Sequence, residues 1–168
     1  RAQLHLELGQ IFEGHLEKVE LACAHYCHAL DDARDISGGG EEHVAEAIDG
    51  LERLLSLTEN PTRLADYLQP CYVKREYWEG VADILELRIH HSSDHEANIR
   101  FLNELATVYE YKLERYRDAL GALLRAFQAE PMAVQLRPEI VRLAKRVGDF
   151  TGVIRAYRSC GHLLEPHV

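Results

Sequence analysis

Apolar side chains recur every three or four residues along almost the whole chain, and this spacing is the strongest constraint on its fold. Near the N-terminus the pattern is formed by Leu4, Leu8, Ile11 and Phe12. In the second half it returns in Leu102, Leu105, Val108 and Tyr109. Such spacing gathers apolar side chains on one face of an α-helix, and no segment shows the sustained alternation typical of a strand. The sequence therefore predicts an all-α fold.

The same pattern predicts about nine helices. They are expected over residues 2–14, 17–34, 41–57, 61–75, 77–91, 95–113, 116–129, 136–147 and 150–163. Helix-end signals agree with these limits, because Asn60 precedes Pro61 as an N-cap candidate and Ser93 or Asp94 can cap the helix that follows. Gly148 is typical of a helix end.

Prolines and one glycine run interrupt or bound these helices. Pro70 lies inside an apolar helical pattern and removes a backbone hydrogen bond, so we expect a kink or a break near residues 68–71. Pro131 closes the helix before it, and Pro138 is expected to start the next one. Residues 37–42 include three consecutive glycines, whose ordering costs much backbone entropy, and we expect a flexible loop there.

The composition fits a folded domain of the cytoplasm. The 168 residues are 46% hydrophobic and 28% charged, enough for a hydrophobic core without metal or disulfide help. No run of 18 apolar residues occurs, so no membrane is expected as a partner. The cysteines are few and irregularly spaced, which favours reduced thiols; they are Cys23, Cys27, Cys71 and Cys160. Because the first residues lack an initiator Met and a signal peptide, we expect an excerpt of a longer chain.

The net charge of −9 comes from the first third of the chain. Residues 1–60 hold 13 acidic and 4 basic side chains, whereas residues 61–168 hold 15 of each. Residues 137–158 contain six basic and only two acidic side chains. An acidic surface repels phosphate backbones, so nucleic acid is not an expected partner. The asymmetry predicts instead that the ends steer contacts with neighbouring domains or with another copy.

The chain also contains an internal duplication. Shifting it by 97 residues aligns residues 5–30 with residues 102–127, and seven of the 26 positions are identical, among them Glu13 with Glu110. In the first copy a small residue, Gly9, is followed three positions later by the large Phe12. Because small residues let two helices approach closely, this pattern predicts tight helix pairs in both copies.

These positions resemble tetratricopeptide repeats, whose helix-turn-helix unit carries Leu-Gly, Tyr or Phe, two Ala residues around an aromatic, and Pro. The first copy supplies Leu8, Gly9, Phe12, Ala22, Tyr26 and Ala29. The later copy supplies Leu105, Ala106, Tyr109, Ala119, Leu123, Ala126 and Pro131. Both have one extra residue in the turn between their helices. A third unit keeps Gly148 and Tyr157 but has Val153 and Cys160 at the alanine positions.

The resemblance implies one repeat domain over residues 1–168, a right-handed superhelix of antiparallel helix pairs. Its units would cover residues 2–34, 41–91, 95–131 and 136–163, the second being divergent, within a larger protein of bacterial type that supplies neighbouring repeats. The first helix of each pair would line a concave face that binds partners. Matching helix positions gives as lining residues Gln3, Leu6, Gln10, Glu13, Arg100, Asn103, Thr107, Glu110 and Tyr111.

Two clusters contain residue types that bind metals. In Cys-Ala-His-Tyr-Cys-His, residues 23–28, the candidate metal or haem ligands are Cys23, Cys27 and His28, although the mid-helix position of the string favours buried helix cysteines. A second cluster at a helix end would bind zinc, sense pH or stay solvated, and it consists of His90, His91, Asp94 and His95. Trp78 is expected to pack between adjacent helices.

The sequence therefore predicts a non-catalytic scaffold that binds a peptide or a partner domain. It shows no nucleophile elbow, glycine-rich cofactor loop or spaced zinc motif, so we expect neither an enzyme nor a cofactor. Two alternatives stay open. One is a regulatory or sensory repeat domain attached to an enzyme outside this sequence, and the other is a helical domain that binds a metal or haem.

Overall fold

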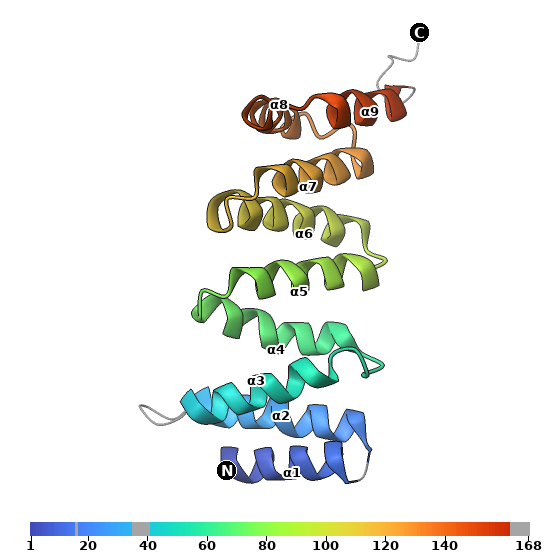
Figure 1. Cartoon of the computed structure of the whole chain (residues 1–168). Coiled ribbons are helices and arrows are strands. Elements are labelled where there is room, and N and C mark those ends of the chain that lie inside the picture. The colour runs from blue at the N-terminus through green and yellow to red at the C-terminus, as the bar shows by residue number, and fades with distance from the viewer. Residues whose placement is uncertain (16, 35–40, 162–168) are drawn as a thin grey trace. The chain divides into compact units, whose positions relative to one another are not determined.

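The computed structural model describes residues 1–15, 17–34 and 41–161, which form helices joined by short turns and contain no strand (Figure 1). The all-α prediction is confirmed. The described residues form nine α-helices and one π-helical turn: α1 (Ala2–Gly14), α2 (Val19–Arg34), α3 (Glu41–Leu54), α4 (Pro61–Lys74), α5 (Trp78–His91), α6 (His95–Thr107), η1 (Val108–Lys112), α7 (Tyr116–Ala129), α8 (Leu136–Val147) and α9 (Thr151–Ser159).

The helix ends follow the predicted limits closely. Asp94 caps α6, because its carboxylate accepts hydrogen bonds from the backbone N–H groups of Glu96 and Ala97 at 3.0 and 3.3 Å. Gly148 ends α8 in the left-handed conformation at φ +73°. Asn60 precedes Pro61 at the start of α4, although its side chain makes no cap hydrogen bond. Of the predicted loop over residues 37–42, residues 37–40 lie outside the described residues, and α3 begins directly after them.

A kink or a break was expected near Pro70, and the break is wrong, because α4 continues through this residue as one helix. Proline removes a single backbone donor, whereas α4 buries apolar side chains on both sides of this position, including Leu68 and Cys71. Most helix stability in proteins comes from such packing rather than from local propensity, so tertiary contacts hold the helix together here. Pro138 lies in the first turn of α8, where the missing N–H costs nothing.

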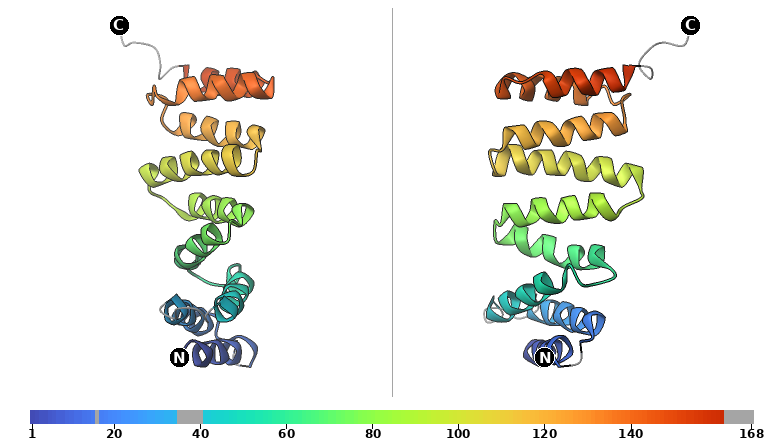
Figure 2. Two further views of the ribbon diagram at one scale, coloured as in Figure 1. Left: turned by 90° about the vertical axis from the view of Figure 1, so that its left-hand side faces the viewer. Right: turned by 45° about the vertical axis from the view of Figure 1, so that its right-hand side comes forward.

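The chain divides into two compact units, Arg1–Glu76 and Tyr77–Val168. In the first, α2 packs against both α1 and α3, and α1 also contacts α3. In the second, α7 packs against α6, α8 and α9, while α6 and η1 pack against α5. Figure 2 shows the consecutive helices of each unit stacked side by side. The single superhelical domain implied by the tetratricopeptide resemblance stays a prediction.

Two backbone features that follow α1 recur 97 residues later, after η1. Glu17 and Glu114, 97 residues apart, have positive φ angles of 50° and 54°. The backbone N–H of Lys18 donates to the carbonyl of residue 12 at 2.9 Å, and that of Arg115 donates to the carbonyl of residue 109 at 2.7 Å. The 97-residue duplication therefore extends to the backbone of the turn.

Tyr26 of α2 is the centre of the first unit's core. Its side chain is fully buried and lies against two glycines, Gly9 of α1 and Gly50 of α3. A Cβ atom would come within 2.7 Å of the ring at Gly9 and within 2.6 Å at Gly50, closer than carbon atoms pack. The two glycines thus let α1 and α3 close on the ring, which confirms that small residues allow tight helix contacts here.

The corresponding core of the second unit is filled differently. Ala106 and Leu123 occupy the positions equivalent to Gly9 and Tyr26, and both are buried. The large aromatic side chain of this core is that of Phe127 on α7. It is fully buried and stacks on Tyr157 of α9, with ring centroids 4.6 Å apart. The two copies therefore share a backbone pattern but fill their cores with different side chains.

No helix in the described part of the chain is both long and apolar enough to cross a membrane.

Candidate functional site

The four residues predicted on α1 do not form one exposed face. Leu6 is buried, so it belongs to the core rather than to a partner surface. Gln3 and Gln10 are exposed, and their amide groups donate to Glu7 of the same helix and to Glu46 of α3. Leu6 is buried because α1 packs against both α2 and α3, and Leu6 lies on the covered side of the helix with Ala2 and Gly9.

Glu13, the fourth of these residues, is held inside the first unit. Its carboxylate accepts a hydrogen bond from the Tyr26 hydroxyl at 2.6 Å and two from the Arg53 guanidinium at 2.8 and 2.9 Å. The Arg53 hydrogen bonds are the main reason that the pKa of Glu13 is lowered from its ordinary value of 4.5. Burial, aided by Glu13, raises the pKa of Tyr26. Glu13 therefore ties α1 to α2 and α3.

The five residues predicted on α6 and η1 differ in their exposure. Arg100, Thr107 and Tyr111 are exposed, and Tyr111 has 67% of its surface open to solvent. Asn103 is half-buried, and its carbonyl accepts the Thr107 hydroxyl at 2.9 Å. Glu110 is buried. Three of the five thus lie on an open surface.

Glu110 plays the same structural part in the second unit as Glu13 does in the first. Its two carboxylate oxygens accept hydrogen bonds from the Arg142 guanidinium of α8 at 2.6 and 2.7 Å. Arg142 also pairs with Glu139 at 2.7 Å, and the hydrogen bonds to Glu110 followed by those to Glu139 raise its pKa. In each copy, the duplicated glutamate reaches an arginine on the helix that follows the pair.

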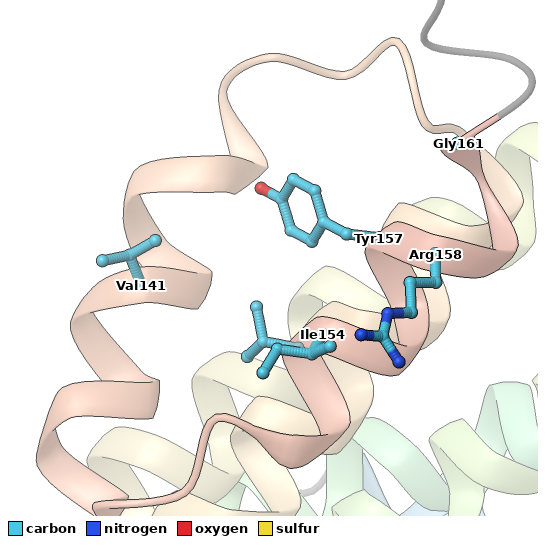
Figure 3. A pocket seen from close by; sticks show the side chains of 6 residues that line it. Val141, Ile154, Tyr157, Arg158 and Gly161 are labelled. Carbon is cyan, nitrogen blue, oxygen red and sulfur yellow. The ribbon is translucent and has the colours of Figure 1, made fainter.

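An open apolar hollow lies on α8 and α9, and none of its lining residues is among the predicted site residues. Figure 3 shows Ile154 and Tyr157 of α9 facing Val141 of α8 across this hollow. Val153, Arg158 and Gly161 complete the lining. Ile154 is 51% exposed and Val141 is 37% exposed, so the two helices leave apolar side chains of the hollow open to solvent. The available sequence signal was that Ile154 directly follows another apolar residue, Val153, because neighbouring residues of a helix point in different directions and cannot both face the core.

The structure separates the thiols of residues 23–28 from the imidazoles. Cys23 and Cys27 are buried, and burial raises the pKa of Cys23 to about 11, which keeps its thiol protonated. His25 stacks on Phe12, and its Nδ1 lies 3.0 Å from Nδ1 of His5. His28, the third candidate ligand, also lies beside His5, with ring centroids 5.2 Å apart. The candidate ligands therefore do not converge on one point.

The second cluster is likewise dispersed. His90 and His91 are exposed at the end of α5, with ring centroids 5.1 Å apart, while the Asp94 carboxylate caps α6. His95 is exposed in the first turn of α6. Across the described residues, no three His, Cys, Asp or Glu side chains lie together as metal ligands would. Trp78, the first residue of α5, contacts η1, because the Lys112 ammonium lies 4.5 Å from its ring centre.

Comparison with known proteins identified no related family or curated sequence. No protein-family model matches the chain, and no curated protein matches its sequence significantly.

Proposed function

We propose that this chain is a non-catalytic scaffold of tetratricopeptide-like repeats that binds a peptide or a partner domain, with its binding surface on α6 and η1. The observation that carries the proposal is the exposure of Tyr111, an aromatic side chain left largely in solvent on a helical turn. Tyrosine and arginine are enriched among the residues that dominate protein interfaces. Arg100 and Thr107 precede Tyr111 at helical spacing on the same side.

Arg100 is available to a partner. Its guanidinium lies 3.8 Å from the Glu96 carboxylate, and both side chains are exposed. An exposed ion pair of this kind contributes little to stability. The Arg100 guanidinium can therefore leave Glu96 and bind a carboxylate or carbonyl group of a ligand instead.

The spacing suggests what kind of ligand fits. Arg100 and Tyr111 lie 11 residues apart, which corresponds to roughly 16 Å along a helix axis. An extended peptide of about five residues spans this distance. The expected ligand therefore presents an acidic or carbonyl group near one end and an apolar or aromatic side chain near the other.

The surface is smaller than the sequence alone indicated. Leu6 is buried, and Glu13 and Glu110 are engaged in hydrogen bonds between helices. The proposal accordingly rests on Arg100, Thr107 and Tyr111.

The test is a comparison of three proteins as baits in an extract of the source cell. They are the parent, the double variant Arg100→Glu/Tyr111→Ala, and the control Arg117→Glu/Met132→Ala. The control makes the same kinds of change, a charge reversal and the loss of a large exposed side chain, on α7 and the turn after it. Circular dichroism checks that all three are folded, and calorimetry measures the affinity of each protein for any partner identified.

A partner bound by the parent and the control, and bound at least tenfold more weakly by the Arg100/Tyr111 variant, supports the proposed surface. Tenfold corresponds to about 1.4 kcal/mol, the loss expected when one interface anchor is removed. Equal binding by all three proteins contradicts it, because the surface would then lie elsewhere.

A further inference from the structure

Tyr111 lies between two residues that are held by different helices. Glu110 is buried, and its carboxylate accepts hydrogen bonds from the Arg142 guanidinium of α8 at 2.6 and 2.7 Å. After Tyr111 in the chain, the Lys112 ammonium lies 4.5 Å from the centre of the Trp78 ring on α5. Within the second unit, α5 and α8 lie on opposite sides of α6 (Figure 1). The turn that carries Tyr111 is therefore fastened in two directions.

The backbone of this turn is also held by hydrogen bonds. In the π-helical turn η1, the backbone N–H of Leu113 donates to the carbonyl of Val108 at 3.1 Å. The N–H of Arg115 donates to the carbonyl of Tyr109 at 2.7 Å, and the Arg115 guanidinium lies 4.9 Å from the centre of the Tyr109 ring. Single π-helical turns are frequent at functional sites. From this fixed turn the Tyr111 side chain projects into solvent, with 67% of its surface exposed.

The first copy of the duplication shows that the fold does not require this arrangement. The 97-residue shift places Gly14 and His15 at the positions of Tyr111 and Lys112. Glu13 nevertheless reaches an arginine on a following helix, as its duplicate does. The contact between glutamate and arginine is thus common to both copies, whereas the exposed tyrosine and the lysine beside it are particular to the later copy.

The contact of Lys112 with Trp78 has a counterpart between the next helices. The Arg146 guanidinium of α8 lies 3.9 Å from the centre of the Tyr116 ring on α7 and donates to its hydroxyl at 2.8 Å. In both contacts the aromatic residue begins a helix and the cation lies near the end of a later one. Arg146 provides a matched control, because its contact belongs to the same unit but does not flank Tyr111.

We propose that Glu110 and Lys112 are positioning residues, which hold Tyr111 in its outward position as a preformed anchor for the partner. The inference rests on the proposed function, in which Tyr111 contacts that partner. A side chain that is already fixed in its binding position loses less conformational entropy when the partner binds. The two flanking contacts therefore raise affinity without touching the partner.

The positioning role has a test that needs no partner. Lys112→Met removes the charge and keeps most of the side chain, Lys112→Arg keeps a cation beside the Trp78 ring, and Arg146→Met removes the matched contact. Nuclear magnetic resonance measures the amide hydrogen exchange of Leu113, and three-bond couplings give the χ1 rotamers of Tyr111. The chain contains one tryptophan, so tryptophan fluorescence reports on the Lys112 contact.

In Lys112→Met we expect the Leu113 amide to exchange about threefold faster, the factor that corresponds to the loss of one exposed cation–π contact. Tyr111 should populate one χ1 rotamer in the parent and several in this variant, and the tryptophan fluorescence should change. Lys112→Arg should restore the exchange rate and the rotamer, and Arg146→Met should alter neither. Parental behaviour in Lys112→Met, no recovery in Lys112→Arg, or the same changes in Arg146→Met overturns the proposal.

A binding measurement distinguishes this proposal from the proposed function. Calorimetry compares the affinity of a partner captured by the parent for the parent, Lys112→Met, Arg146→Met and Tyr111→Ala. Lys112→Met alone among the two contact variants should bind up to threefold more weakly, because the competent rotamer then falls to about one third of the population. Equal binding by Tyr111→Ala and the parent contradicts the proposed surface, whatever the rotamers show. Weaker binding by Tyr111→Ala with parental binding by Lys112→Met leaves the surface in place and overturns the positioning role.

Discussion

Replacing Gly50 by alanine tests the packing of Tyr26, the feature on which the core of the first unit depends. The new Cβ would lie 2.6 Å from Cε2 and Cζ of the ring. The ring has little room to move, because Gly9 also contacts it and its hydroxyl is bonded to Glu13 at 2.6 Å. Gly121 of α7 is a matched control, because a Cβ there meets nothing within 4 Å.

The magnitude follows from one stabilising and two destabilising effects. Alanine in place of glycine inside a helix stabilises by about 1 kcal/mol, because it reduces the entropy of the unfolded chain. Overpacking a filled core costs about 1–3 kcal/mol. Moving the ring would also break its hydroxyl bond to Glu13, at about 1 kcal/mol for a partly exposed pair. We therefore expect Gly50→Ala to be less stable than Gly121→Ala by about 2–4 kcal/mol.

The free energy of unfolding is measured by urea unfolding followed by circular dichroism. Amide hydrogen exchange, read by mass spectrometry, then shows which helices have lost stability. Exchange should accelerate in peptides from α1, α2 and α3 of Gly50→Ala and stay unchanged in α7. Tyr26→Leu, which installs the residue found at the equivalent Leu123, should make Gly50→Ala much less costly. If Gly50→Ala is as stable as Gly121→Ala, the ring is not confined and the reasoning is refuted.

Three further predictions concern single side chains. Because the pKa of Glu13 is lowered in the folded state, its stabilising effect is present above its ordinary value of 4.5 and is lost as the pH falls through the lower, folded value. Urea midpoints measured from pH 7 to pH 3 should fall less steeply for Glu13→Gln than for the parent, and parallel curves would contradict this. Arg142→Met leaves the buried Glu110 carboxylate without its bidentate partner and should destabilise the second unit by about 1–3 kcal/mol, checked by urea unfolding against the exposed control Arg117→Met. Cys23, whose thiol has a pKa of about 11 and is buried, should react with a thiol reagent at pH 7.5 at least tenfold more slowly in the native protein than in urea, and equal rates would show that it is accessible.

Helix positions could be predicted from the sequence because their causes are local. The three- and four-residue spacing of apolar side chains marked every helix in the described residues, and short-range signals such as Asp94 and Gly148 marked their ends. The duplication was visible as identities at a fixed shift, and the turns at Glu17 and Glu114 repeat it in their backbone. Pro70 is the exception, since burial on both sides outweighed a local rule.

The candidate site depended on contacts that no local pattern encodes. The sequence by itself determined that Glu13 and Glu110 are equivalent and lie on helices. Only the tertiary structure decided that both are engaged internally, because their arginines, Arg53 and Arg142, follow at separations of 40 and 32 residues. Helical spacing tells which residues share a face, whereas burial depends on which neighbouring helix covers that face. For this reason Leu6 lies in the core, and the hollow at Ile154 appeared only once α8 and α9 were in place.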